Sequence, residues 1–246
     1  MKRFARTEIL LGQPALTRLA SARVAVFGLG GVGSYTVEAL ARSGIGHIRL
    51  IDIDVVSYPN FNRQLFALES TLDKPKVEVA VNRIKDINPD CTVEAHQVFS
   101  DSETCLELLG GKLDVVVDAI DSLTPKIELL AKSVEIGIPT ISCMGASSRT
   151  DPLKIKIGDI SETYSCPLAK FVRKRLKKKG ITTGITCVFS DEDVVTPEIS
   201  EVNPDENEPQ IGRRRPPLGS LSYMTGIFGL IAAREVLKVL LPDELL

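Results

Sequence analysis

The sequence predicts an α/β protein, a Rossmann-like, doubly wound and mostly parallel sheet with a C-terminal extension packed on it. Short apolar runs rich in valine and isoleucine alternate with helical patterns up to about residue 145, which is typical of successive βαβ units. Gly28, Gly30 and Gly33 show the G-x-G-x-x-G spacing directly after one such run. With 246 residues and 43% hydrophobic content, the chain can fill one large core, so we expect a single domain over 1–246.

The first two elements are a helix over 4–20 and a strand over 24–27. Apolar residues recur at helical spacing in the first segment, and four consecutive apolar residues in the second are typical of a buried parallel strand. The helical residues expected to contact the core are Ile9, Leu10, Leu16 and Leu19.

The glycine-rich loop leads into a helix over 32–42 and predicts a nucleotide site. Gly28 permits a tight turn, Gly30 and its neighbour Gly31 let the backbone approach a phosphate, and Gly33 lets the helix pack closely on the strand. The N-terminus of the helix offers free N–H groups and a positive dipole to an anion. The motif alone is equally typical of NAD and FAD proteins.

A second strand over 48–51 ends in Asp52-Ile53-Asp54. Asp52 lies about 20 residues beyond the glycines, where an acidic side chain meets the ribose hydroxyls of a bound nucleotide. We place Asp52 and Asp54 in the nucleotide site. A helix-capping aspartate in a β–α loop is the alternative for Asp52.

Residues 55–75 predict a long polar loop that runs into a helix beginning near Lys76. Asn60, Arg63 and Lys76 are close in the chain to the nucleotide site, and cations there suit a triphosphate better than a pyrophosphate held by backbone alone. Any one of these side chains is more often a solvated surface group, so the prediction depends on their combination.

A carboxylate follows a later strand of the same sheet. Asp121 and Ser122 come just after the carboxyl end of this strand, the edge where open α/β sheets bind ligands. A carboxylate there can hold Mg²⁺ against phosphates, so Asp121 is the predicted metal ligand. The elements expected in this part are strands over 92–97, 113–117 and 140–143 and a helix over 125–135.

Beyond Gly145 we expect a strand over 153–157 and a strongly basic helix over 168–179. Seven of the ten residues from 170 to 179 are basic, whereas a solvated face normally mixes signs. This pattern favours contact with the phosphate backbone of a nucleic acid, with solubility alone as the alternative. The seven residues are Lys170, Arg173, Lys174, Arg175, Lys177, Lys178 and Lys179.

The C-terminal part combines a polar segment with an apolar helix. Residues 190–217 are acidic and proline-containing and end in an arginine triplet, which predicts a mobile loop. A long helix over 218–240 follows. Its apolar stretch at 221–233 is shorter than the roughly 20 residues that span a membrane, so we expect a core or dimer-interface helix and no membrane insertion.

Composition indicates a reducing compartment. The five cysteines are an odd number and none forms a C-x-x-C pair, which argues against disulfides and against a four-cysteine zinc site. The N-terminus has no apolar run of signal-peptide length. We therefore expect a cytoplasmic protein with buried, inert thiols. Because the net charge is only −2, nucleic-acid binding requires local clusters.

Taken together, these residues resemble the E1-like adenylating family, which contains ubiquitin-activating enzymes and bacterial activators of ubiquitin-like sulfur carriers. The similarity covers roughly residues 3–145 and implies a nucleotide-binding core at about 1–145, followed by a substrate-binding part at about 146–246. The motifs that carry it are Arg3-Phe4-Ala5-Arg6, Gly28 to Gly33, Asp52-Ile53-Asp54, Asn60 to Gln64, Lys74 to Glu78 and Asp121-Ser122.

The resemblance implies a role for each motif, with ATP and Mg²⁺ as cofactors. The equivalents of Asp52 hold the ribose, those of Asn60, Arg63 and Lys76 hold the phosphates, and that of Asp121 holds the magnesium. The equivalent of Arg6 reaches into the partner subunit's ATP site, which implies a homodimer. The expected catalytic residues are Arg6, Arg63, Lys76 and Asp121.

Within the family, the similarity is greatest to the members that dehydrate N6-threonylcarbamoyladenosine in tRNA, and it then extends over nearly the whole chain. The shared segments are Asp118 to Lys126, Cys187 to Ser190 and Thr225 to Gly229. This resemblance implies that ATP adenylates the carboxylate of the modified nucleoside, which then cyclises with release of AMP and pyrophosphate. The sulfur-carrier activators have two C-x-x-C pairs, which this sequence lacks. A sulfur-transfer protein is a further candidate partner.

Three other functions stay open at this point: an activator of a ubiquitin-like sulfur carrier, a nicotinamide dehydrogenase, and a nucleotide sensor without enzymatic activity. A nicotinamide dehydrogenase has no need of the group formed by Asn60, Arg63 and Lys76. Cys187 is either a covalent thiol, as in ubiquitin-type activators, or a buried structural one.

Overall fold

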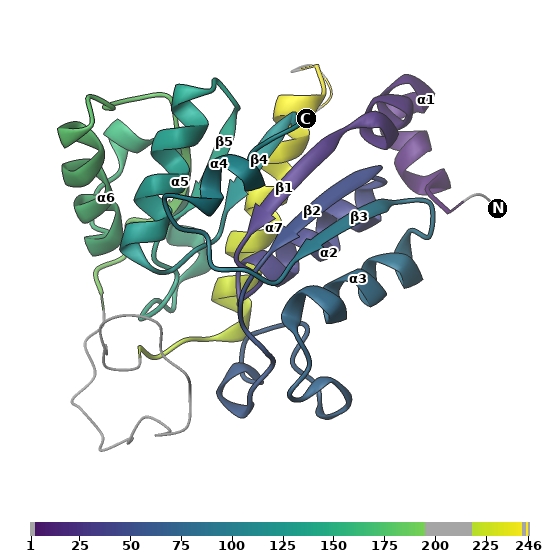
Figure 1. Ribbon diagram of the computed structural model, residues 1–246, viewed down its shortest axis with the longest axis horizontal. Coiled ribbons are helices and arrows are strands. Elements are labelled where there is room, and N and C mark those ends of the chain that lie inside the picture. Colours follow the sequence, from purple (N-terminus) through teal and green to yellow (C-terminus); the bar gives the residue numbers. More distant parts are fainter. Residues whose placement is uncertain (1–2, 195–217, 243–244, 246) are drawn as a thin grey trace.

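The computed structural model describes residues 3–194, 218–242 and 245, and it shows helices on both faces of one central sheet (Figure 1). The strands are β1 (Arg23–Phe27), β2 (His47–Ile51), β3 (Thr92–His96), β4 (Val115–Asp118), β5 (Thr140–Cys143), β6 (Ile155–Asp159) and β7 (Thr186–Ser190). The helices are α1 (Ala5–Ser21), α2 (Gly33–Ser43), α3 (Lys76–Ile87), α4 (Thr104–Leu108), α5 (Leu123–Glu135), α6 (Pro167–Lys178) and α7 (Ser222–Leu240).

The seven strands lie in the order β3-β2-β1-β4-β5-β7-β6. All neighbouring strands pair in parallel except β6, which runs antiparallel to β7 at the edge. The strand order reverses between β1 and β4, so the sheet has the topological switch point at which doubly wound folds bind nucleotides. The predicted fold class is therefore confirmed.

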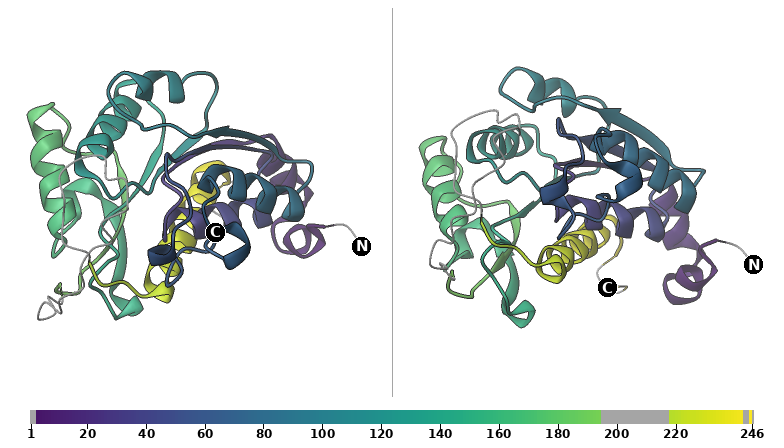
Figure 2. Two further views of the ribbon diagram at one scale, coloured as in Figure 1. Left: turned by 60° about the horizontal axis from the view of Figure 1, so that its bottom comes forward. Right: turned by 90° about the horizontal axis from the view of Figure 1, so that it is seen from below.

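The sheet is covered on both faces (Figure 2). Alternate side chains of β1 enter different cores: Val24 and Val26 pack in the cluster that includes Phe228 of α7, whereas Phe27 packs with Leu129 of α5. Strands buried on both faces read as continuous apolar runs, which is why β1 was recognisable from four consecutive hydrophobic residues.

The C-terminal helix α7 packs on α2 at very short range. A Cβ built on Gly229 would lie 2.3 Å from the Val32 carbonyl oxygen, and the Thr36 hydroxyl donates a hydrogen bond to the Gly229 carbonyl at 3.1 Å. Met224 and Phe228 of this helix are fully buried. The predicted C-terminal extension on the sheet is thus confirmed, and no helix of the described residues is long and apolar enough to cross a membrane.

Several expectations need correction. Ile9 and Leu10 are 83% and 79% exposed, and it is Leu11, just before the kink of α1 at Gly12 (φ +81°), that contacts the core. The strand expected over 153–157 begins at Ile155, since Pro152–Lys154 form a 3₁₀ turn. Helix α4 and strand β7 were not predicted.

The prediction of a mobile loop over 190–217 is wrong for the first residues of this segment. Ser190 is buried and ends β7, and Glu192 accepts hydrogen bonds from the backbone N–H groups of Thr150 and Asp151 at 2.9 to 3.0 Å. The remainder of the predicted loop, 195–217, lies outside the described residues.

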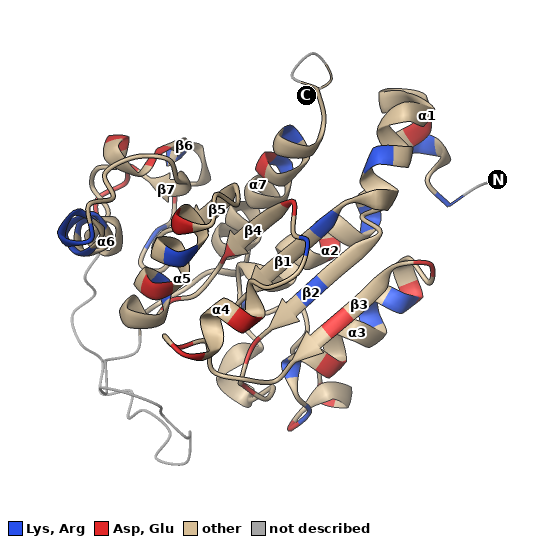
Figure 3. Ribbon diagram, turned by 45° about the horizontal axis from the view of Figure 1, so that its top comes forward, with Lys and Arg blue, Asp and Glu red and all other residues tan. Residues whose placement is uncertain are grey.

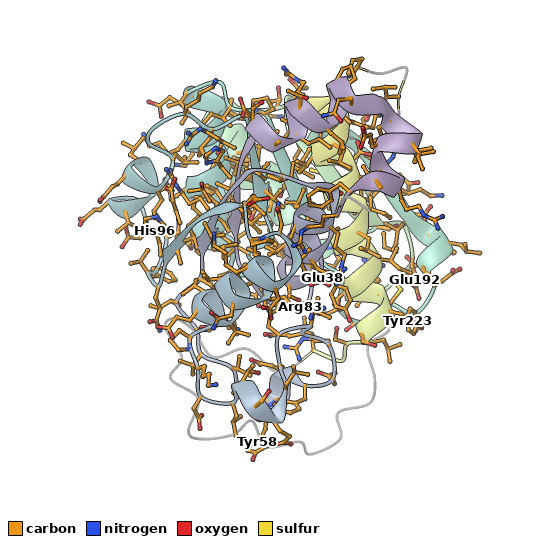
Figure 4. The ribbon with its side chains drawn as sticks, turned by 90° about the vertical axis from the view of Figure 1, so that its right-hand side faces the viewer. Glu38, Tyr58, Arg83, His96, Glu192 and Tyr223 are labelled. Atoms are coloured by element: carbon orange, nitrogen blue, oxygen red, sulfur yellow. The ribbon has the colours of Figure 1, made fainter. Side chains whose placement is uncertain are left out.

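The short loop at 148–151 contacts the residues that precede and the residues that follow the 195–217 stretch. Besides Glu192, the Thr150 backbone carbonyl accepts a hydrogen bond from the Tyr223 hydroxyl at 2.8 Å. The Ser148 N–H donates to the Gly219 carbonyl at 2.8 Å. Glu192 and Tyr223 accordingly lie near one another on the same side of the molecule (Figure 4).

Candidate functional site

The glycine loop after β1 has the geometry of a phosphate cradle. Gly28 has φ +88°, and a Cβ built on it would lie 2.8 Å from the Ala119 carbonyl oxygen. At Gly33 a Cβ would lie 1.8 Å from the Gly28 carbonyl oxygen. The Ser34 N–H donates to the Gly30 carbonyl at 3.0 Å, but no side chain caps α2, so its N-terminus is open to an anion. Backbone packing therefore requires glycine at positions 28 and 33, whereas a Cβ on Gly30 would meet only the Gln64 side chain at 3.8 Å.

Asp52 contacts the glycine loop directly. Its carboxylate accepts hydrogen bonds from the N–H groups of Leu29 at 2.5 Å and Asp54 at 2.8 Å. Burial raises the pKa of Asp52, the nearby positive charge of Lys76 lowers it in part, and the net shift is upward. A raised folded-state pKa means that the ionised group costs stability, and the cost is complete above that pKa and absent below the unfolded value.

Lys76 lies at the start of α3, beside Asp52. Its Nζ pairs with the Asp54 carboxylate at 2.8 Å, and its backbone N–H donates to the Asp54 carbonyl at 3.0 Å. The Lys76 side chain is 5% exposed, whereas that of Asp54 is 60% exposed. The buried ammonium of Lys76 is thus paired with a carboxylate that is largely exposed to solvent.

The 55–75 loop brings Asn60 and Arg63 beside the cradle. Asn60 is buried, and its Oδ1 accepts the Ser57 N–H at 3.2 Å. Arg63 donates to the Pro59 carbonyl at 2.8 Å and to the Asn62 Oδ1 at 2.9 Å. Two contacts join this loop to the cradle: the Leu65 N–H donates to the Ser34 hydroxyl at 3.2 Å, and Gly30 faces the Gln64 amide. Tyr58 marks the outer tip of this loop (Figure 4).

Asp121 is exposed just beyond the carboxyl end of β4, and its carboxylate accepts the Ser122 hydroxyl at 3.3 Å. The Ala119 carbonyl of the same connection touches the Gly28 turn. The connection that carries Asp121 is therefore in direct contact with the cradle.

A buried ion pair beneath this connection was not foreseen. Lys126 and Asp118 are both fully buried and pair at 2.7 Å. Lys126 also donates to the Ile120 carbonyl at 2.8 Å, while Asp118 accepts from the Ile120 N–H at 3.1 Å and from the Ser142 hydroxyl at 2.6 Å. The pair thus fixes both sides of the Ile120 peptide, immediately before Asp121. A buried lysine five residues beyond a surface aspartate cannot be distinguished in the sequence from an exposed one.

These residues fit a nucleoside triphosphate and one Mg²⁺. Backbone N–H groups, Arg63 and Lys76 supply positive charge, and Asp52 supplies an acceptor for ribose hydroxyls. Asp121 offers one free carboxylate, which suits Mg²⁺ because that ion normally takes one or two carboxylates together with phosphate oxygens and water. Among the described residues no cluster of three or more His, Cys, Asp or Glu could hold a metal unaided.

Two predicted groups lie away from the cradle. Arg6 is exposed on α1, which packs at the amino ends of β1 and β2, at the opposite edge of the sheet (Figure 1). The basic residues of α6 lie on the other flank, beyond α5 (Figure 3). The structure therefore brings Asp52, Asp54 and Lys76 together beside the glycine loop and places the segments that carry Asn60, Arg63 and Asp121 against it, whereas Arg6 and α6 lie elsewhere.

All five cysteines are buried and free of disulfides. Burial raises the pKa of Cys187 well above its usual value and that of Cys143 to about 12. Because the thiolate is the reactive form, these thiols are inert, as the sequence predicted.

Comparison with known proteins agrees with this geometry. A tRNA threonylcarbamoyladenosine dehydratase of Bacillus subtilis (strain 168) is 42% identical over 244 residues, covering 99% of this chain and 96% of the relative. The structure of the Escherichia coli tRNA N6-threonylcarbamoyladenosine dehydratase in complex with ATP is similar, with a TM-score of 0.88 and 36% identity over 98% of this chain and 95% of the other.

A relative from another branch aligns with only part of the chain. A molybdopterin-synthase adenylyltransferase of Salmonella typhimurium is 35% identical over 140 residues, which is 57% of this chain and 54% of that protein. The family model described as the ThiF family matches residues 4–245. The expected E1-like resemblance is confirmed, and the chain belongs to the ThiF family.

Proposed function

We propose that this protein is an ATP-dependent dehydratase that converts N6-threonylcarbamoyladenosine in tRNA to its cyclic form. The observation that carries the proposal is the similarity to dehydratases over almost the full length of both chains. The nucleotide cradle supports it, because an adenylating enzyme must bind the ribose and the phosphates of ATP. Asp52 offers an acceptor for the ribose hydroxyls, and Arg63 and Lys76 offer positive charge for the phosphates. Residues 1–145 serve as the nucleotide-binding core, and 146–246 as the substrate-binding part.

In the first half-reaction, a carboxylate oxygen of the nucleoside attacks the α-phosphorus of ATP, and pyrophosphate leaves. Arg63 and Lys76 stabilise the negative charge that develops on the phosphate oxygens, and Arg6 of the partner subunit adds a third cation in a homodimer. Asp121 holds Mg²⁺, which neutralises phosphate charge. The exposed Ile9 and Leu10 beside Arg6 support an α1-mediated dimer contact.

In the second half-reaction, a nucleophile within the same modified side chain attacks the acyl carbon, loses its proton and expels AMP. The nucleoside loses one water in total. No protein nucleophile is needed, because both reacting groups belong to one side chain and proximity supplies much of the rate. The burial of Cys187 supports this route over a covalent one.

The runner-up is an activator of a ubiquitin-like sulfur carrier. It shares the adenylating chemistry, but the relative of that type aligns with little more than half of this chain. None of the buried cysteines in the described residues belongs to a metal cluster of the kind that such activators carry. We place the enzyme in the cytoplasm, where its tRNA substrate is found, and retain a sulfur-transfer protein as a candidate partner.

The decisive experiment uses tRNA that carries threonylcarbamoyladenosine. The purified protein and Mg²⁺ are incubated with this tRNA with and without ATP, and the released nucleosides are weighed by mass spectrometry. A nucleoside lighter by one water only when ATP is present supports the proposal. An unchanged nucleoside, with ATP bound and the protein folded, would overturn it. Pyrophosphate exchange that requires an added small protein ending in Gly-Gly would then favour the runner-up.

A further inference from the structure

The basic helix α6 borders a groove of about 450 Å³. The groove lies between α6 and the segments at 160–161 and 181–182, and the apolar side chains of Ile160, Leu176 and Ile181 form part of its lining. Four cations and two hydroxyl groups line the groove, and no carboxylate does so. These six residues are Lys170, Arg173, Lys174, Lys177, Ser161 and Thr182.

The lysines of this groove have no acidic partner. Lys170, Lys174 and Lys177 form no ion pair among the described residues, whereas Lys179 at the end of the helix pairs with Glu128 at 3.0 Å. Arg173 is occupied differently, since its guanidinium donates to the carbonyl and hydroxyl of Thr163. The groove therefore holds three free ammonium groups on a scaffold that Arg173 fixes.

An aromatic ring lies on the same helix. Phe171 is 54% exposed although it is strongly apolar, and it is followed at helical spacing by Lys174 and Arg175. An exposed aromatic side chain among cations is the combination with which proteins hold single-stranded nucleic acid, because the ring stacks on an unpaired base while the cations hold phosphates.

The N-terminal end of α6 lies at the catalytic edge of the sheet. Gly145 follows β5, and a Cβ built on it would lie 3.6 Å from the Cys166 sulfur and 3.9 Å from Leu168, at the start of α6. The groove borders the same helix farther on, from Lys170 to Lys177, which is about 10 Å along the helix axis. A strand bound in it thus leads away from the edge that carries Asp121.

We propose that α6 docks the single-stranded loop that surrounds the substrate nucleoside, with phosphates at Lys170, Lys174 and Lys177 and one unpaired base stacked on Phe171. This inference rests on the proposed function, which supplies a tRNA whose reactive nucleoside lies next to the anticodon. A duplex would satisfy the lysines equally well, but only an unpaired base has a face free for Phe171.

The lysine contribution is tested by RNA affinity with the full chain and without ATP. Lys170→Gln, Lys174→Gln and Lys177→Gln are combined, leaving Arg173 intact because it supports the fold. Three lost phosphate contacts should weaken binding of an anticodon stem-loop by about 100-fold at 0.15 M salt and reduce the slope of log affinity against log salt by about 2 to 3. ATP affinity should stay at the wild-type value.

The matched control removes the same number of charges elsewhere. Lys85→Gln, Lys112→Gln and Lys238→Gln are combined, because these lysines lie on α3, before β4 and on α7. This variant should bind the stem-loop within about threefold of the wild type. Equal losses in both variants would mean that net charge alone determines binding, and that result would overturn the proposed surface.

The stacking contact has its own readout, since the chain contains no tryptophan. Phe171→Trp introduces a single tryptophan, which can be excited selectively over the four tyrosines; its emission should be quenched when the stem-loop binds and left unchanged by a blunt duplex of equal length. Leu106→Trp is the control, because Leu106 is 48% exposed on α4. Failure of the stem-loop to quench Phe171→Trp, or equal quenching in the control, would refute stacking.

The outcomes of these experiments distinguish a failure of the proposed RNA-binding surface from a failure of the proposed function. If RNA binds through α6 but its nucleoside never loses water, the surface stands and the dehydratase proposal fails. If the triple lysine variant binds and dehydrates tRNA like the wild type, the dehydratase proposal stands and the surface is wrong.

Discussion

Replacing Lys126 tests the buried pair beneath the catalytic connection. Lys126→Met keeps the length of the side chain but removes its charge and its bond to the Ile120 carbonyl. The Asp118 carboxylate is then left fully buried without its cation. Because a charge in a low-dielectric interior is costly when its partner is absent, we expect this single change to be strongly destabilising.

The magnitude follows from burial and geometry. Breaking a buried pair by removing one partner costs about 3–5 kcal/mol. For a chain of this size, each kcal/mol lowers Tm by about 2–4 °C, so a loss near 4 kcal/mol corresponds to about 8–16 °C. Adding Asp118→Asn removes the orphan charge but retains acceptors and donors for Ile120 and Ser142, and it should recover about 2 kcal/mol or more.

The free energy of unfolding is measured by urea denaturation of the wild type, both single variants and the double variant. Equal m-values would show that the same surface is exposed in each case. A Lys126→Met variant within about 1 kcal/mol of the wild type, or a double variant as unstable as the sum of the singles, would refute the reasoning.

Three further predictions concern the cradle. Asp52→Asn should lower the free energy of unfolding at pH 7 by no more than about 1–3 kcal/mol, because it relieves the burial of a charge but leaves one of the two N–H groups of Leu29 and Asp54 without its acceptor oxygen. Since a charge-assisted bond of about 1.5–3 kcal/mol is lost, it should also weaken ATP binding by about 10- to 150-fold, as measured by calorimetry. For the same reason wild-type ATP affinity should fall as pH decreases through the pKa of Asp52, and an affinity that is flat with pH would contradict this role. Arg63→Ala and Asp121→Ala should each lower turnover about 100-fold or more while urea stability changes by less than about 1 kcal/mol, with Arg42→Ala as a control; near-normal rates in both would reject the assigned roles. Cys187→Ala should keep full turnover and cost on the order of 1 kcal/mol of stability, whereas loss of turnover in a folded variant would revive a covalent thiol.

The sheet could be predicted because its signals are local. Apolar runs such as Val24 to Phe27 indicate strands that are buried on both faces of the sheet. Gly28 and Gly33 indicate positions where the backbone packs too closely for a Cβ. The Asp52 position followed from the distance between a glycine loop and the end of the next strand. These features need no knowledge of remote neighbours.

The predictions failed where contacts between residues far apart in the sequence determine the structure. Ile9 and Leu10 have the apolar character of core residues, but it is their neighbour Leu11 that contacts the core. Strand β7 pairs with β5 across 45 residues and with β6 across 27 to 35 residues, and no local pattern shows such pairing. The role of Lys126 likewise depends on Asp118 and Ser142 meeting it in space.

The loop at 148–151 has a consequence for protein engineering. It binds Glu192 on one side of the 195–217 stretch and Gly219 and Tyr223 on the other, so both flanks are anchored independently of what joins them. The free-energy cost of closing a chain segment between two fixed points rises by only about 0.6 kcal/mol for each doubling of its length. A tag or a small domain inserted between the anchors should therefore leave the nucleotide cradle intact, which makes this stretch the preferred attachment point for a reporter.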